Sequence, residues 1–206
     1  QLYRSLDYGA NWENLKVDTI FRNYFYLANT EQHSFVTASA VFNEFELFRT
    51  NNKGATLTKV NTTGLGTQRV NYLASNKHKL FSVVHPSQDL YASTDEGETW
   101  TKVNNSEPNF KNLKRVFCFD SLIVATQSSD IFVSKDNGIT WRSIKNNLLY
   151  NYYNITVLYH DHKLLISGEG LPVQLSNEDF TEWYEIDPTG LPFNNDNYGM
   201  AIKGQD

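Results

Sequence analysis

An eight-residue pattern, S-x-D-x-G-x-x-W, constrains the fold of this chain more than any other feature. It occurs three times, at residues 5–12, 93–100 and 134–141. Two degenerate copies, which fit the pattern only in part, lie at a similar spacing, at residues 50–57 and 176–183. The third positions fall at 7, 52, 95, 136 and 178, at intervals of 45, 43, 41 and 42 residues. A fixed period of this length is the signature of a repeat architecture.

The residue types of the octamer indicate a turn. Asp or Asn at the third position can accept hydrogen bonds from backbone N–H groups, and Gly two residues later allows a positive φ. The Ser or Thr hydroxyl can bond further backbone groups, and the Trp offers a large plate for packing between repeats. We therefore assign a structural role to Ser5, Asp7, Gly9, Trp12, Thr50, Asn52, Gly54, Ser93, Asp95, Gly97, Trp100, Ser134, Asp136, Gly138, Trp141, Ser176, Glu178 and Trp183.

Between the octamers the chain alternates short runs rich in Val, Ile, Tyr, Phe and Thr with polar turns, which predicts an all-β protein. In one repeat these runs are residues 70–75, 79–84, 89–93 and 100–103. The octamer lies in the turn between the third and fourth runs. Four antiparallel strands in about 42 residues are typical of one blade of a β-propeller.

The octamers resemble the Asp box, or BNR repeat, of sialidases, sortilin-type receptors and other propeller families. Five copies in register cover nearly the whole chain. The resemblance implies a β-propeller, usually in a secreted, periplasmic or lumenal protein. It implies no single activity, since the box occurs in hydrolases, receptors and assembly factors alike.

The repeat divides the chain into blades of a single domain, residues 1–206. We expect a half blade at 1–17, whole blades at 18–60, 61–103, 104–144 and 145–186, and a closing strand in 187–206. The half blade and the closing strand then form one blade shared between the termini, which gives five blades. The alternative is a fragment of a propeller with six or more blades.

Composition argues against several partners. The net charge is −5 and the Lys and Arg residues form no cluster, so we expect no nucleic-acid ligand. No apolar run reaches the length of a membrane span, so we expect no membrane insertion. The pair His160 and His162 flanks one residue in a tight turn without a third ligand, and we predict no metal and no cofactor. Cys118 has no partner for a disulfide. The oligomeric state is left open.

We expect function on the face opposite the boxes, where propellers usually bind ligands. The loop 145–153 holds three tyrosines, and Tyr150, Asn151 and Tyr152 are its candidate ligand-binding residues. His85 and Arg69 are further candidates on the same face. The alternative for Tyr152 is a place in the core at the start of the next strand.

Two function classes remain. We favour a non-catalytic interaction module that binds a protein, peptide or glycan. The alternative is a divergent or truncated glycoside hydrolase, with Glu44 and Glu169 as weak candidates for its two carboxylates. A sialidase resembling the known family would carry an arginine triad and an R-I-P segment before the first box. No R-I-P occurs, and three of the six arginines, Arg4, Arg49 and Arg142, flank boxes.

Overall fold

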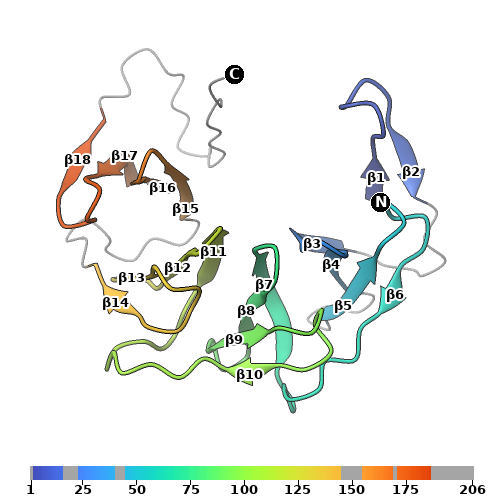
Figure 1. Ribbon diagram of the computed structural model, residues 1–206, viewed down its shortest axis with the longest axis horizontal. Coiled ribbons are helices and arrows are strands. Elements are labelled where there is room, and N and C mark those ends of the chain that lie inside the picture. The colour runs from blue at the N-terminus through green and yellow to red at the C-terminus, as the bar shows by residue number, and fades with distance from the viewer. Residues whose placement is uncertain (1, 16–22, 40–44, 145–154, 169–170, 187–206) are drawn as a thin grey trace. The chain divides into compact units, whose positions relative to one another are not determined.

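The structure is a computed structural model, and it describes residues 2–15, 23–39, 45–144, 155–168 and 171–186. The chain divides into two compact units, Gln1–Asn104 and Asn105–Asp206, and each is described by itself. Every regular element in the described residues is a β-strand. In Figure 1 the strands follow one another as separate antiparallel sheets.

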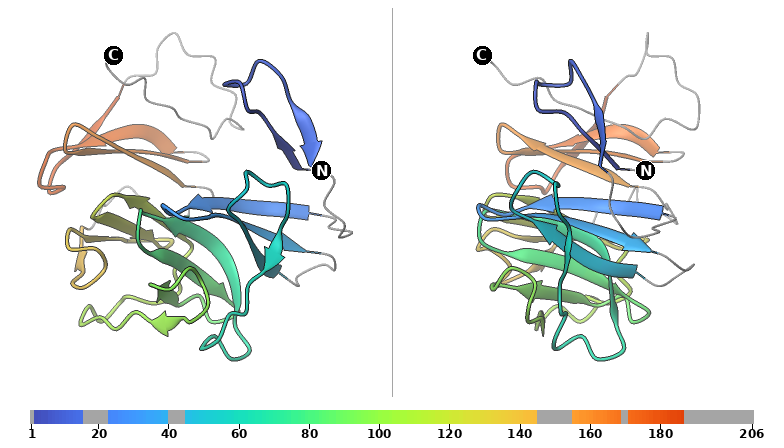
Figure 2. Two further views of the ribbon diagram at one scale, coloured as in Figure 1. Left: turned by 45° about the vertical axis from the view of Figure 1, so that its right-hand side comes forward. Right: turned by 90° about the vertical axis from the view of Figure 1, so that its right-hand side faces the viewer.

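The first unit contains one two-stranded sheet and two four-stranded sheets. The two-stranded sheet pairs β1 with β2, and the four-stranded sheets follow the chain order β3-β4-β5-β6 and β7-β8-β9-β10. Figure 2 shows the β1–β2 hairpin in blue as a two-stranded ribbon. The bounds are β1 Leu2–Arg4, β2 Glu13–Leu15, β3 Asn23–Asn29, β4 Ser34–Ser39, β5 Phe45–Thr50, β6 Thr58–Lys59, β7 Arg69–Ser75, β8 Leu80–His85, β9 Leu90–Ser93 and β10 Thr101–Lys102.

In the described residues of the second unit there are two four-stranded sheets in chain order, β11-β12-β13-β14 and β15-β16-β17-β18. All neighbouring strands are antiparallel. The bounds are β11 Arg115–Phe119, β12 Leu122–Thr126, β13 Ile131–Ser134, β14 Arg142–Ser143, β15 Thr156–His160, β16 Lys163–Gly168, β17 Leu171–Ser176 and β18 Trp183–Glu185.

The core of each unit lies between consecutive four-stranded sheets. In the first unit Phe35 and Leu47 from one sheet and Leu80 and Trp100 from the next belong to one buried cluster. Inner strands are strongly buried because both of their faces are covered: β12 and β13 are buried along their whole lengths. Removing such surface from water is the main force that holds consecutive sheets together.

The second unit has an equivalent cluster that joins Leu122 and Val133 of one sheet to Val157 and Ile166 of the next. Cys118 lies in β11 as a free, half-buried thiol. Burial raises its pKa well above the ordinary range, so it is not a reactive thiolate.

The prediction of an all-β chain of four-stranded antiparallel blades is confirmed. Four whole blades and the two-stranded half of a fifth fit the five-bladed form. The strands of each whole blade fall inside one predicted range, such as β7 to β10 within 61–103. The expected closing strand in 187–206 lies outside the described residues. Whether the chain forms a single domain stays a prediction.

Candidate functional site

The boxes form closed turns with a shared hydrogen-bond pattern. In the copy at 93–100 the Ser93 hydroxyl donates to Asp95 Oδ1 at 2.8 Å and accepts from Gly97 N at 2.9 Å. Asp95 Oδ1 also accepts from Thr99 N at 2.9 Å. The copies at 5–12 and 134–141 repeat these three bonds within 0.2 Å. The side chains of the box are therefore occupied with their own turn.

Two consecutive residues with positive φ make the turn possible. In the copy at 93–100 they are Glu96, with φ 58°, and Gly97, with φ 84°. The glycine accepts the larger angle without a steric penalty. Trp100 Nε1 donates to the Gly97 carbonyl at 2.8 Å, so the first residue after the turn is hydrogen-bonded to the turn.

Hydrogen bonds keep the box carboxylates ionised. The backbone N–H of Asn11, then its side chain and that of Ser5, lower the pKa of Asp7 to about 2. The hydroxyl and N–H of Thr140 lower the pKa of Asp136 to about 2. Burial acts to raise the pKa of Asp95, but hydrogen bonds from Thr99 and Ser93 outweigh it and the net shift is downward. These carboxylates are poor candidates for proton donors at neutral pH.

The two degenerate copies differ from each other. In the copy at 50–57 the amide oxygen of Asn52 takes the place of the carboxylate, accepting from Thr50 Oγ1 at 2.8 Å and Thr56 N at 3.0 Å. In the last copy the sequence places Glu178 at the third position, but Asn177 forms the turn: its Oδ1 accepts from Thr181 N at 2.8 Å. The last turn is thus anchored one residue earlier than predicted.

One box also joins two sheets of the first unit. Glu96 Oε2 accepts from Thr30 Oγ1 at 2.8 Å and lies 3.0 Å from His33 Nδ1. Arg49 forms an ion pair with Glu98 at 2.7 Å and donates to the Glu96 carbonyl at 3.2 Å. The turn at 93–100 is therefore held by the preceding sheet as well as by its own bonds.

The opposite ends of these strands carry the other face. Strand β5 runs toward its box, and β7 runs toward the β7–β8 turn at the same end of the sheets. The first residues of β5 and β7 therefore lie at the end away from the boxes, together with the last residues of β6 and β8. We call this end of the first unit the box-distant face. Arg69 and His85 are directly opposite each other there, as the first residue of β7 and the last of β8. Both side chains are exposed.

The loop after His85 is well ordered by its own bonds. Ser87 N donates to the Gln68 side chain at 2.9 Å, and Gln88 N donates to the Val84 carbonyl at 2.9 Å. The His85–Pro86 peptide bond is cis. The two hydrogen bonds hold the loop beside Arg69.

Arg69 also lines a hollow of about 200 Å³. Its polar lining comes from Lys59, Thr62, Gln68, Arg69 and Glu46, over a floor of aliphatic side chains. Lys59 forms an ion pair with Glu46 across β5 and β6. The hollow therefore combines two cationic groups, hydrogen-bonding side chains and a carboxylate.

The Lys59–Glu46 pair belongs to a repeated feature that the sequence reasoning missed. Asp89 and Lys102 occupy the same positions in the next sheet and form an ion pair at 2.7 Å. In the second unit Asp130 is buried and accepts from the Ser143 hydroxyl at 2.7 Å. In three of the five repeats an acid stands six residues before the third box position and Lys or Ser stands seven residues after it, and this spacing is the signal that could have revealed these pairs.

Other candidate residues cannot be placed. Tyr150, Asn151 and Tyr152, and the carboxylates Glu44 and Glu169, lie outside the described residues. Within the described part of the chain no three His, Cys, Asp or Glu side chains gather as a metal site. His162 contacts the Tyr159 hydroxyl at 3.4 Å in an exposed turn.

Comparisons with known proteins agree with this architecture. The sequence profile of the BNR/Asp-box repeat matches residues 132–143. No curated protein sequence matches the chain. Among solved structures, the GH74 enzyme of Niastella koreensis superposes with a TM-score of 0.64 at 21% identity, over 93% of this chain and 34% of that one.

Two structures of YCF48 are also similar. YCF48 from Cyanidioschyzon merolae has a TM-score of 0.61 at 15% identity, over 85% of this chain and 59% of that one. YCF48 bound to D1 peptide has a TM-score of 0.52 at 13% identity, over 89% of this chain and 72% of that one. The chain thus spans about a third of the length of the GH74 enzyme and somewhat over half of YCF48 from C. merolae.

At these sequence identities the superpositions show the fold. The profile match falls on one of the three octamers that fit the full S-x-D-x-G-x-x-W pattern. The sheet order, the box turns and the structural likeness agree. The chain therefore carries a match to the BNR/Asp-box repeat at residues 132–143 and shares its fold with the GH74 enzyme and YCF48.

Proposed function

We propose that this chain is a non-catalytic interaction module that binds a protein or peptide ligand on its box-distant face. The observation that carries the proposal is the hollow beside the Arg69–His85 pair, with Lys59 and Arg69 in its lining. Lys59 is paired with Glu46, so the two cations and one carboxylate leave the hollow with a net positive charge. This charge, beside hydrogen-bonding side chains, favours a ligand segment with an acidic side chain or a terminal carboxylate.

The chemistry of the two ends of the sheets supports this choice of face. At the box end, Ser, Asp and Gly groups are already bonded within the turns. At the box-distant end, the side chains of Arg69 and His85 are exposed beside an open hollow. The structure of YCF48 with a peptide is a precedent for peptide binding by a similar fold. The Tyr150–Tyr152 loop remains a second candidate surface.

The location is part of the same proposal. The Asp-box resemblance favours a secreted, periplasmic or lumenal protein. Within the described residues there is no helix with the length and apolarity that a membrane crossing requires.

The proposal can be tested on arrays of acidic and basic 15-residue peptides and of glycans. We expect acidic peptides to bind, and Arg69→Glu to weaken binding at least about tenfold, since a charge reversal replaces attraction with repulsion. The matched control is Lys77→Glu, in the exposed turn between β7 and β8 at the box end. Equal binding by both variants and the unchanged protein would refute the assignment of the face.

The glycoside hydrolase alternative is favoured by the likeness to the GH74 fold. A screen with aryl glycosides and sialosides tests it, repeated on Glu44→Gln and Glu169→Gln. Turnover that is lost in either variant would replace the binding proposal with catalysis. Binding of glycans alone, without turnover, would keep the module but change the class of its ligand.

A further inference from the structure

A second and larger cleft lies on the other side of the β3–β6 sheet, where the β1–β2 hairpin packs on it. It encloses about 580 Å³, within the range of small-molecule sites. The hairpin and the sheet are in close contact at Gly54, where an added Cβ would come within 2.6 Å of Leu15 Cδ1. This cleft shares no residue with the hollow on the box-distant face.

The walls of the cleft are mainly apolar. They include Leu6, Leu15, Leu27, Phe35 and Leu57. Two of these are large side chains that face solvent, Leu6 with 60% exposure and Leu27 with 67%. Exposed apolar groups gathered around a concave site are a mark of ligand binding.

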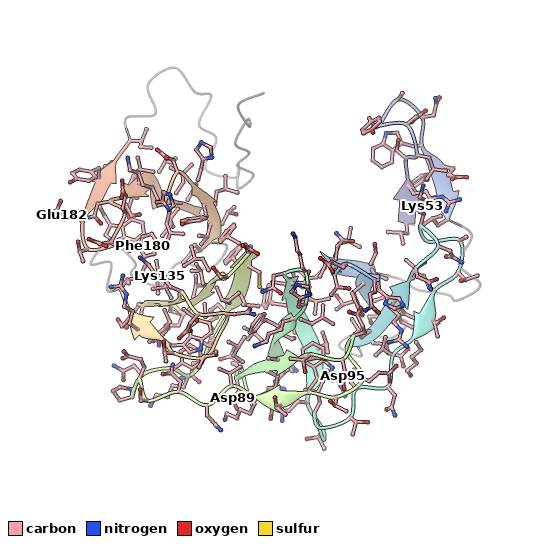
Figure 3. All side chains as sticks on the ribbon, in the orientation of Figure 1. Lys53, Asp89, Asp95, Lys135, Phe180 and Glu182 are labelled. Atoms are coloured by element: carbon pink, nitrogen blue, oxygen red, sulfur yellow. The ribbon has the colours of Figure 1, made fainter. Side chains whose placement is uncertain are left out.

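The charged groups of the cleft all have one sign. Arg4 and Lys53 line it, and none of the described lining residues carries a carboxylate, although the chain as a whole has a net charge of −5. Arg4 is paired with Glu13 and donates to the Lys53 carbonyl at 2.6 Å. The Lys53 ammonium makes no ion pair within the described residues. Figure 3 labels Lys53 in the turn between β5 and β6, near the hairpin.

Two of the hydroxyl groups at the rim of the cleft, those of Ser5 and Thr50, already have partners. Ser5 Oγ bonds Asp7 and Gly9, and Thr50 Oγ1 bonds Asn52 and Gly54. A peptide lying in the cleft would bring backbone amides that need partners, and leaving them without partners is costly. An occupant with a long apolar body and one acidic group meets no such cost.

We propose that this cleft binds a single-chain amphiphile with an anionic head, such as a long-chain carboxylate. The acyl chain lies between Leu15, Leu27 and Leu57, and the carboxylate pairs with Lys53. Apolar burial supplies the affinity and the ammonium selects the charge of the head.

The test uses a fluorescent probe, 11-(dansylamino)undecanoic acid, titrated against the protein and displaced by competitors. We expect saturable binding with a blue-shifted emission, displacement by dodecanoate, and little displacement by dodecyltrimethylammonium. Lys53→Gln should lower the affinity for the probe about fivefold, as expected for the loss of a partly exposed ion pair. Its control is Lys77→Gln, another lysine in an exposed turn of the same unit.

The apolar wall has its own matched pair of variants. Leu27→Ser removes a wall residue that is 67% exposed, and Ile139→Ser removes an equally exposed side chain outside the cleft, at 70%. Both variants should fold, and only Leu27→Ser should lower the affinity for the probe. Equal displacement by the anionic and cationic detergents would overturn the proposal. So would displacement by apolar peptides without displacement by dodecanoate, which would assign the cleft to a peptide.

Discussion

The boxes at 5–12 and 93–100 have the same internal bonds and opposite surroundings. In both, Ser, Asp and Gly form the same turn, and the Trp indole donates to the glycine carbonyl at 3.0 and 2.8 Å. Yet Trp12 is 65% exposed and Trp100 only 2%. The first belongs to a two-stranded sheet, whereas the second packs among two four-stranded sheets.

This difference separates two roles of the motif. The turn is a local structure that the octamer forms by itself, even on a small hairpin. The burial of the tryptophan depends on the sheets around it and is a property of the assembled repeat. Stability should therefore follow the surroundings of each copy more than its match to the pattern.

The largest effect should come from the two tryptophans. We expect Trp100→Ala to lower the free energy of unfolding of the first unit by about 3–5 kcal/mol, because it leaves a cavity between two sheets. Trp12→Ala should cost less than about 1 kcal/mol. Urea unfolding measures both. Equal losses would show that the box, rather than its surroundings, determines stability.

The last copy provides the next test. Asn177→Ala should cost about 1–2 kcal/mol, since Asn177 Oδ1 accepts from Thr181 N at 2.8 Å and Glu182 N at 3.3 Å. Glu178→Ala, one residue along at an exposed position, should be nearly neutral. Thermal unfolding compares the two. A larger loss for Glu178→Ala would restore the register predicted from the sequence.

The contacts of the box at 93–100 with the preceding sheet should have a smaller effect. Arg49→Ala removes the ion pair with Glu98 and the bond to the Glu96 carbonyl, and should cost about 1 kcal/mol. A double-mutant cycle with Glu98→Ala measures the share of the ion pair. A coupling energy of zero would show that Arg49 stabilises through its backbone contact alone.

The smallest effect should be in the acid response of the box carboxylates. Hydrogen bonds lower the pKa of Asp136 from its ordinary value of 3.8 to about 2 in the folded state. Such a group stabilises the fold above its unfolded pKa, and the contribution disappears as the pH falls from about 4 to about 2. Asp136→Asn keeps an acceptor oxygen, as Asn52 does, and should flatten this loss in urea titrations at pH 2.5 and 4. An unchanged slope would contradict the assigned role of the carboxylate.

The sequence was sufficient for the blades because each box marks the same turn in each repeat. Once Asp95 and Asp136 are aligned, the four strands on either side follow from the alternation of apolar runs and turns. The exposure of Trp12 could not be predicted, because the octamer is the same whether or not a full sheet surrounds it. Burial is a tertiary property.

The candidate site was predictable only in part. The order of the strands puts Arg69 and His85 at the box-distant ends of β7 and β8, but their pairing depends on the β7–β8 register, which includes a bulge between Val70 and Tyr72. The shift from Glu178 to Asn177 was hidden because the repeat interval puts Glu178 at the third position, although Asn is the residue type that suits the turn. The Lys59–Glu46 ion pair was missed, although the spacing of the two residues around their box signals it.

The most direct test of the account is a hydrogen-exchange footprint of the tightest acidic peptide from the array. We predict slower amide exchange in residues 62–69 and 85–89, on the box-distant face, and unchanged exchange in the box turn at 93–97. The Lys77→Glu variant should give the same footprint, and Arg69→Glu should abolish it. Protection confined to the box turns, with residues 62–69 and 85–89 unchanged, would contradict the division of this protein into a structural end and a binding end.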